Sequence, residues 1–203
     1  LNGEVVDSMG GGICQVSTTL YNAVLRAELN VTERSPHSMT VHYVDLSEDA
    51  AIAGTYKDFK FVNSTEYPIY IEGYTTSDKK ITFNIYGKET RDKNRTISFE
   101  SQMVSETPAT TILQEDAGQG IGYKAVSSKG SSGYVAELYK IVKVNGVETD
   151  RIKVNKSTYK GTNRVVTYGT AGDPTLSENL RAAIAAQDEA LADANIAAAV
   201  PAQ

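Results

Sequence analysis

The sequence predicts an α+β protein built from three segments. We expect a small cysteine-bearing α+β domain with antiparallel strands over residues 1–92, an elongated all-β domain over residues 93–171, and an alanine-rich tail, helical or disordered, over residues 172–203. Three observations carry this prediction. First, apolar residues at helical spacing follow a glycine-rich turn. Second, short runs in which apolar and polar residues alternate, separated by turn residues, fill most of the chain after that helix. Third, the composition changes abruptly to alanine after Asp173.

The first helix is expected over residues 15–29. Apolar residues recur there at steps of three and four, which is typical of a helix with one buried face: Val16, Leu20, Ala23, Val24 and Ala27. Asn30 tolerates the left-handed conformation and is the expected C-terminal cap. A helix anchored in this way would hold its N-terminus in a fixed position.

Strands are expected wherever β-branched and aromatic residues alternate between turn signals. In the first domain these runs are 41–44, 51–53, 59–62, 69–71 and 81–85. The charged stretch 88–95 looks like a solvated linker, so we place a domain boundary near residue 92. In the second domain, Asn145-Gly146 between two alternating runs predicts a β-hairpin. The tail lacks a clear apolar periodicity, so we expect it to be loosely attached.

Composition excludes some classes of function. The chain of 203 residues has a net charge of -5, a pI near 5.1 and no basic block, which argues against a nucleic-acid partner. It has no apolar run of about 20 residues that could span a membrane. Because it opens at Leu1 directly on the turn signal Asn2-Gly3, we expect an upstream part, including any export signal, to be missing from this sequence.

The only cysteine, Cys14, follows Gly10-Gly11-Gly12 at a junction between a turn and the predicted helix. The free N–H groups and the dipole at a helix N-terminus favour an anion, so they would promote ionisation of a thiol and could hold an oxyanion. A lone cysteine often only fills apolar space. The polar Gln15 and Ser17 beside this one do not suit that role.

The two histidines of the chain, His37 and His42, both lie within 30 residues of Cys14. A short loop and a returning strand could bring either of them back to the helix N-terminus. A zinc site made of these three residues is a weaker alternative, because they lack the short paired spacings of structural zinc sites. We expect no metal and no cofactor.

The chain resembles the VanW-like domain over about residues 1–88. The resemblance rests on the stretch from Gly10 to Ala23 and on four shorter motifs: Pro36-His37-Ser38, Asp49-Ala50, Asp58-Phe59-Lys60-Phe61 and Tyr67-Pro68-Ile69-Tyr70-Ile71. Residues 95–170 resemble the glycine-named G5 domain, which accompanies such domains on cell surfaces.

VanW-like domains resemble cysteine-dependent L,D-transpeptidases, which cross-link peptidoglycan stem peptides. The resemblance implies Cys14 as nucleophile and His37 as its base, with His42 as the alternative base. Asp49 is our choice for the carboxylate that orients the imidazole, and Asp58 is the reserve. The expected substrate and oxyanion contacts are Gly11, Gly12, Ile13, Gln15, Ser17 and Ser38.

The partners implied are peptidoglycan stem peptides for the first domain and cell-wall glycan for the second. The implied location is the cell wall or membrane-anchored outer surface of a Gram-positive bacterium. A non-catalytic module that binds peptidoglycan or glycan, linked to envelope maintenance or glycopeptide resistance, is the alternative function.

Overall fold

A computed structural model describes residues 12–199, which form two compact units. Unit 1 comprises the residues up to Glu106 and residues 134–160, and unit 2 comprises residues 107–133 and those from Gly161 onward. The units group the chain differently from the predicted segments, because residues 95–106 and 134–160 pair in one sheet that shares a core with the first helix. Each unit is described by itself.

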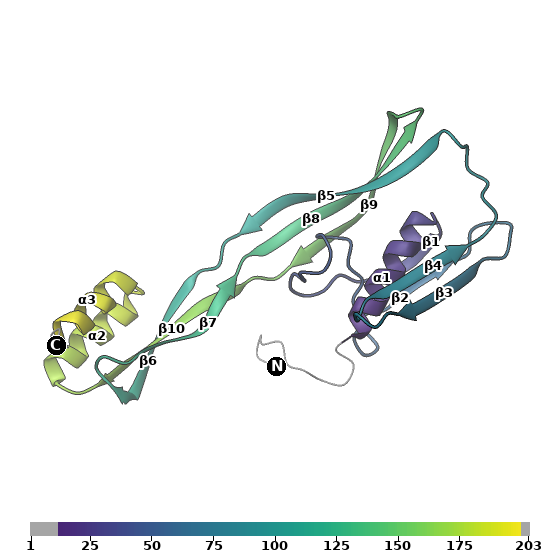
Figure 1. The fold of residues 1–203 in the computed structure, drawn as a ribbon. Helices are drawn as coiled ribbons and strands as arrows, with labels where there is room; N and C mark the ends of the chain where they lie inside the picture. The colour runs from purple at the N-terminus through teal and green to yellow at the C-terminus, as the bar shows by residue number, and fades with distance from the viewer. Residues whose placement is uncertain (1–11, 200–203) are drawn as a thin grey trace. The chain divides into compact units, whose positions relative to one another are not determined.

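Over the described residues from Gly12 onward, unit 1 contains one helix, two antiparallel strand pairs and a three-stranded sheet (Figure 1). β1 pairs with β2, β3 pairs with β4, and the larger sheet has the order β5-β8-β9. Its elements are α1 (Ile13–Arg26), β1 (Asn30–Arg34), β2 (Phe59–Val62), β3 (Tyr70–Thr75), β4 (Ile81–Tyr86), β5 (Arg95–Thr107), β8 (Gly133–Val144) and β9 (Val147–Tyr159).

The predicted hairpin of the second domain is confirmed as β8 and β9. Asn145 and Gly146 form its turn with φ values of 52° and 81°. A two-residue turn with both φ angles positive matches the right-handed twist of the flanking strands, which explains why this dipeptide stands here.

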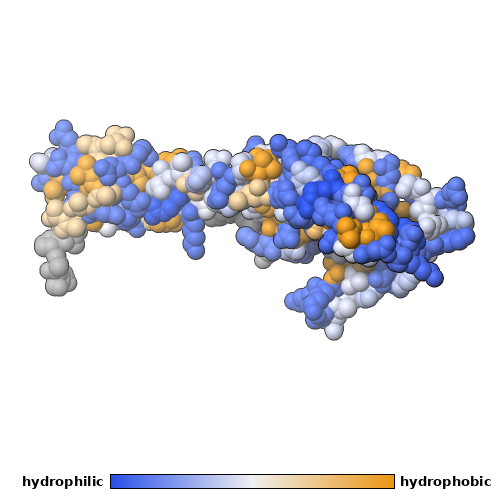
Figure 2. All heavy atoms as spheres, turned by 90° about the horizontal axis from the view of Figure 1, so that it is seen from above, coloured by the Kyte–Doolittle hydropathy of each residue, from blue (hydrophilic) through white to orange (hydrophobic). Residues whose placement is uncertain are grey.

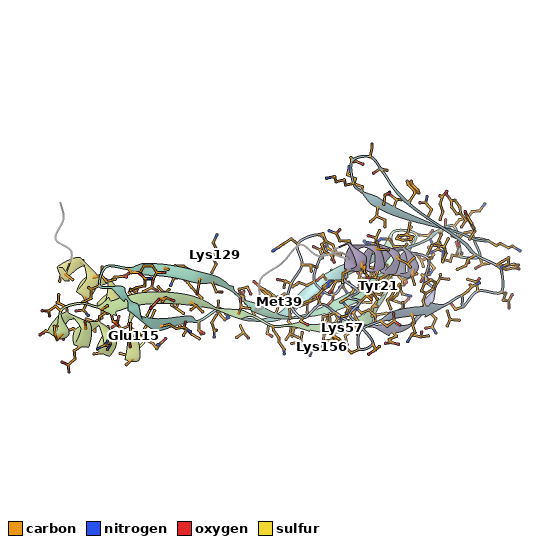
Figure 3. The ribbon with its side chains drawn as sticks, turned by 90° about the horizontal axis from the view of Figure 1, so that it is seen from below. Tyr21, Met39, Lys57, Glu115, Lys129 and Lys156 are labelled. Atoms are coloured by element: carbon orange, nitrogen blue, oxygen red, sulfur yellow. The ribbon has the colours of Figure 1, made fainter. Side chains whose placement is uncertain are left out.

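The core of unit 1 joins α1 to the β5-β8-β9 sheet. Its buried members are Tyr21, Leu25, Ala50 and Leu138, and the half-buried Val31, Phe59, Phe99 and Val154 pack against them. Tyr21, labelled on α1 in Figure 3, is 1% exposed and meets Phe59 edge to face. Leu138 belongs to β8, so the helix is anchored partly by a strand more than 100 residues away in sequence.

The predicted ends of the first helix were wrong. α1 starts two residues earlier, at Ile13, and ends at Arg26 with Ala27 as its C-cap. Glu28 takes the left-handed conformation (φ 56°), whereas Asn30 begins β1, a strand that the pattern did not predict. Ion pairs of the Glu28 carboxylate with Arg95 and Lys140 stabilise this position.

Glu28 is expected to make unit 1 sensitive to acid. The hydrogen-bonded Arg95, together with Lys140, holds the pKa of Glu28 at about 2, against the opposing effect of burial. These contacts therefore stabilise the fold above about pH 4.5, on the order of 2 kcal/mol, and their contribution is lost as the pH falls toward 2. We expect Glu28→Gln to lower the urea midpoint at pH 7 much more than at pH 3. Glu66→Gln is the control at an exposed glutamate, and equal losses at both pH values would contradict the prediction.

The expected strands at residues 41–44 and 51–53 were also wrong. Residues 35–58 form a long irregular segment, in which Ala53 makes a single bridge to Lys57. Its backbone is bonded elsewhere, since Lys160 N donates to Ser38 O at 2.7 Å and Ser47 N donates to the Tyr159 hydroxyl at 2.7 Å. Contacts to β9 and its end thus replace pairing with a neighbouring strand.

Unit 2 is a three-stranded sheet covered by two helices (Figure 1). The sheet has the order β6-β10-β7, with β10 parallel to β6 and antiparallel to β7. Its elements are β6 (Thr111–Gly120), β7 (Lys124–Ser131), β10 (Thr162–Ala171), α2 (Pro174–Ala185) and α3 (Glu189–Ala199).

The expectation of a loosely attached tail was wrong. The tail forms α2 and α3, and its apolar side chains complete the core of unit 2, made of Leu113, Val166, Tyr168, Leu180, Ala183, Ile184 and Ala192. Asp173 caps α2 by accepting from Thr175 N and Leu176 N. Small alanines let the helices approach the sheet closely, so a few larger residues supply the packing that the weak periodicity concealed.

Candidate functional site

Cys14 lies in the first turn of α1 and is half-buried. Its thiol donates to Ile52 O, with Sγ 3.5 Å from that oxygen. The N–H groups of Ile13, Cys14 and Gln15 stand at the start of the helix, where the helix itself offers no acceptor. A carbonyl oxygen held there would therefore meet N–H donors next to the sulfur.

The segment that carries Asp49 is bound along α1. Ser17 Oγ donates to Ala50 O at 2.5 Å, and Thr18 Oγ1 accepts from Ala50 N at 3.0 Å. Ala50 itself is fully buried in the unit 1 core. Polar side chains on one face of the helix thus hold the Asp49-Ala50 pair in position.

The structure brings His37 and Asp49 together. Asp49 Oδ2 lies 2.7 Å from His37 Nδ1 and also accepts from His37 N at 2.6 Å. With Nδ1–H donating to the carboxylate, the tautomer makes Nε2 the ring nitrogen that can accept a proton. The Asp49 side chain is 1% exposed, so this pairing is shielded from water.

Three residues that the sequence did not single out complete this cluster. Arg34 Nη2 and the Tyr159 hydroxyl donate to Asp49 Oδ1 at 2.7 and 2.5 Å. Arg34 Nη1 also donates to Ser157 Oγ at 2.8 Å. Arg34 lies three residues before His37 on the unpredicted strand β1, and the other two come from β9, so no local signal pointed to them.

The buried cluster keeps Asp49 ionised. Burial alone would raise the pKa of Asp49, but the hydrogen bonds from the His37 ring and backbone and from Tyr159, with the charge of Arg34, outweigh it and lower the pKa. Burial and the hydrogen bond to Asp49 raise the pKa of Tyr159, which therefore stays a donor. An ionised Asp49 accepts from His37 Nδ1 and so fixes the orientation of the imidazole ring.

Tyr43 is a further neighbour that the sequence did not indicate. Its hydroxyl lies 3.4 Å from His37 Nε2, and its ring meets the His37 ring edge to face. Burial is the main cause that raises the pKa of Tyr43, and the nearby Cys14 adds to it. Tyr43 thus stands close to both candidate catalytic groups. In residues 12–199, no hydrogen bond joins the Cys14 thiol to the His37 ring.

The expected substrate contacts lie in different surroundings. Ile13 and Gln15 are exposed, whereas Ser17 is buried and donates to Cys14 O and Ala50 O. Ser38 is exposed and accepts from Lys57, which is labelled in Figure 3.

Gly12 has an ordinary φ of -90°, so the conformational freedom expected of glycine is not used at that position. Gly10 and Gly11 lie outside the described residues.

The reserve candidates lie away from the cluster. His42 is exposed, and Asp58 binds Lys60 and the N–H of Phe59.

Within the described part of the chain, no three His, Cys, Asp or Glu side chains are grouped so that they could hold a metal ion. Over the same residues, no helix is long and apolar enough to cross a membrane. On the face drawn in Figure 2, apolar residues form small separate patches in a mostly hydrophilic surface.

Two known protein families match parts of this chain. The family described as VanW like protein matches residues 1–86, and the G5 domain family matches residues 99–171. The chain therefore contains a VanW-like domain followed by a G5 domain. Cys14, Arg34, His37 and Asp49 belong to the VanW-like domain. Tyr159 belongs to the G5 segment, so both domains contribute to the buried cluster inside unit 1.

One curated relative of this chain is Uncharacterized protein YoaR of Bacillus subtilis (strain 168). It is 45% identical over 71 residues, which cover 35% of this chain and 23% of that protein. The aligned region thus spans about a quarter of the relative's length.

Two solved G5 structures are similar to this chain over part of its length. The IgA1 protease G5 domain is 24% identical and covers 41% of this chain and 100% of its own, with a TM-score of 0.30. HP0197-G5 is 20% identical and covers 37% of this chain and 97% of its own, with a TM-score of 0.24.

Proposed function

We propose that this chain is a cell-wall-associated surface protein that binds peptidoglycan. The observation that carries the proposal is the succession of a VanW-like domain and a G5 domain in one chain, since both resemble modules of bacterial cell surfaces. The acidic net charge of -5 favours a partner other than the polyanions of the envelope.

Co-sedimentation with purified, insoluble peptidoglycan tests this proposal. The chain is expected to pellet with peptidoglycan in a saturable manner and to remain in the supernatant with cellulose, a glycan without amino sugars. Equal recovery in the supernatant with both materials would reject wall binding.

A second candidate function is acyl transfer through Cys14. The observation that favours it is the His37–Asp49 pair, with Nε2 available as a base and with Tyr43 near both the His37 ring and Cys14. An acyl transfer needs a nucleophile, a base and donors for the oxyanion. Cys14, His37 and the first-turn N–H groups of α1 supply these three parts.

In the proposed reaction, the Cys14 side chain rotates away from Ile52 O and gives its proton to His37 Nε2. The sulfur then attacks the carbonyl carbon of a stem-peptide amide, and the oxyanion is held by the first-turn N–H groups. The C–N bond breaks, the amine leaves with the proton from His37, and a thioester remains. An acceptor amine attacks the thioester, returns a proton through His37 to the sulfur, and completes the cross-link.

A further inference from the structure

A groove of about 950 Å³ lies in the VanW-like domain, beside the end of α1 that is farther from Cys14. Ala23, Arg26 and Ala27 form its helical wall, and β4 and residues 87–91 form much of the rest. Arg26 is twelve residues beyond Cys14, which is about 18 Å along a helix. The groove is thus separate from the cysteine–histidine cluster, and its volume lies in the range of ligand-binding clefts.

Exposed tyrosine rings extend from the groove along the β3–β4 pair. Tyr86 lines the groove and stacks on Tyr70, with ring centroids 6.0 Å apart and planes inclined by 29°. Their side chains remain 52% and 65% exposed. On the groove wall, Lys88 Nζ lies 4.2 Å from the ring centroid of Tyr67. The stacked pair offers an apolar platform with hydroxyl groups at its edges.

A carboxylate and an amide are held beside these rings. Glu72 Oε2 accepts from Asn84 Nδ2 at 3.0 Å and from the Tyr86 hydroxyl at 3.1 Å. Glu72 and Asn84 are directly opposite each other in the β3–β4 pair, next to the Tyr70–Tyr86 position. The second carboxylate oxygen of Glu72 and the amide oxygen of Asn84 can accept from ligand hydroxyl or amide groups.

The charges along the groove disfavour a polyanion. Four basic side chains line the groove. Arg91 and Arg95 are bound to Glu28, and Arg91 is also bound to Glu89. Arg26 lies 3.7 Å from Glu48, so only Lys88 has no ion pair among the described residues. Little unpaired positive charge is therefore left for a phosphate polymer. Stacked rings with fixed polar groups instead match a neutral chain that has flat apolar faces and many hydroxyls.

We infer that this groove and its tyrosine rim bind a glycan strand of N-acetylated amino sugars. The C–H faces of the pyranose rings stack on Tyr86 and Tyr70, while Glu72 and Asn84 bind hydroxyl and acetamido groups. This inference rests on the proposed wall association, and it assigns glycan binding to the VanW-like domain in addition to the G5 domain.

Titration calorimetry of the whole chain with the β-1,4-linked hexamer of N-acetylglucosamine tests the inference. Tyr86→Ala and Tyr70→Ala should each weaken binding about tenfold, because each removes one stacking face. Tyr56→Ala is the matched control, since Tyr56 is 76% exposed and lies outside the groove, and it should bind as the unaltered chain does. Glu72→Gln keeps the size of the side chain and should weaken binding even if the alanine variants fold poorly.

The outcomes separate the two proposals. If the chain sediments with peptidoglycan but the Tyr86, Tyr70 and Glu72 variants bind the hexamer as tightly as the control, the groove is not the glycan site and wall binding lies elsewhere. If the chain sediments with peptidoglycan but does not bind the hexamer, the inferred ligand class is wrong. If it binds neither material, the proposed wall association itself fails.

Discussion

Asp49→Asn is expected to destabilise unit 1 by about 3–5 kcal/mol, because it leaves the buried Arg34 guanidinium without its carboxylate partner. The Arg34 side chain is 6% exposed and the Asp49 side chain 1%, so water cannot replace the lost ion pair. The same substitution removes the ionised acceptor for His37 and Tyr159. Urea unfolding at pH 7, followed by circular dichroism, measures the loss.

Asp58→Asn is the matched control for this prediction. The Asp58 side chain is 47% exposed and its partner Lys60 is 59% exposed, so the pair is solvated and its loss should leave the urea midpoint unchanged. Similar midpoints for the Asp49 and Asp58 variants would show that the buried cluster does not stabilise the fold.

Cys14→Ser is expected to abolish acyl transfer while leaving the fold intact, because oxygen replaces sulfur in a similar shape but ionises far less readily. His37→Ala should lower kcat/KM by roughly 10²- to 10⁴-fold, the usual contribution of a general base. His42→Ala should change it little, because His42 is exposed and lies outside the Asp49 cluster. Mass spectrometry of cross-linked products from tetrapeptide-stem muropeptides measures the rates.

The order of the histidine effects is the sharpest part of this prediction. Equal losses of kcat/KM in the two histidine variants, or a larger loss for His42→Ala, would show that His37 is not the base. If the Cys14→Ser variant turns over substrate as fast as the unaltered chain does, Cys14 is not the nucleophile. A chain that sediments with peptidoglycan but forms no product would remain a wall-binding module without this chemistry.

Local pattern was a good guide wherever neighbouring residues decide the conformation. The stripe from Val16 to Ala27 predicted the core of α1, and Asn145-Gly146 predicted the β8–β9 turn from its preference for positive φ. The glycine–cysteine stretch and the Pro36-His37-Ser38 and Asp49-Ala50 motifs were enough to recognise the VanW-like domain. These signals span only a few residues each, so no long-range contact was needed to interpret them.

Local pattern failed where distant side chains bind the backbone. The alternating run 41–44 looked like a strand, but its segment is bonded to β9 and its end through Ser38 and Ser47. The tail looked too weakly apolar to pack, yet Leu180 and Ile184 complete the core of unit 2 because Val166 and Tyr168 of β10 meet them. In both cases the partner lies outside any sequence window.

The sequence by itself determined the two domains and the position of Cys14 at the N-terminus of a helix, because each rests on short contiguous motifs. It offered His37 and Asp49 as partners, with His42 and Asp58 as alternatives, and the contact between His37 and Asp49 is made only in the folded chain. Only the tertiary structure decided what surrounds them. Arg34, Ser157 and Tyr159 form the buried cluster around Asp49, although Tyr159 is 110 residues away along the chain. Burial and charge pairing depend on which surfaces meet in space, and those contacts are made only when β9 packs against the loop that carries Asp49.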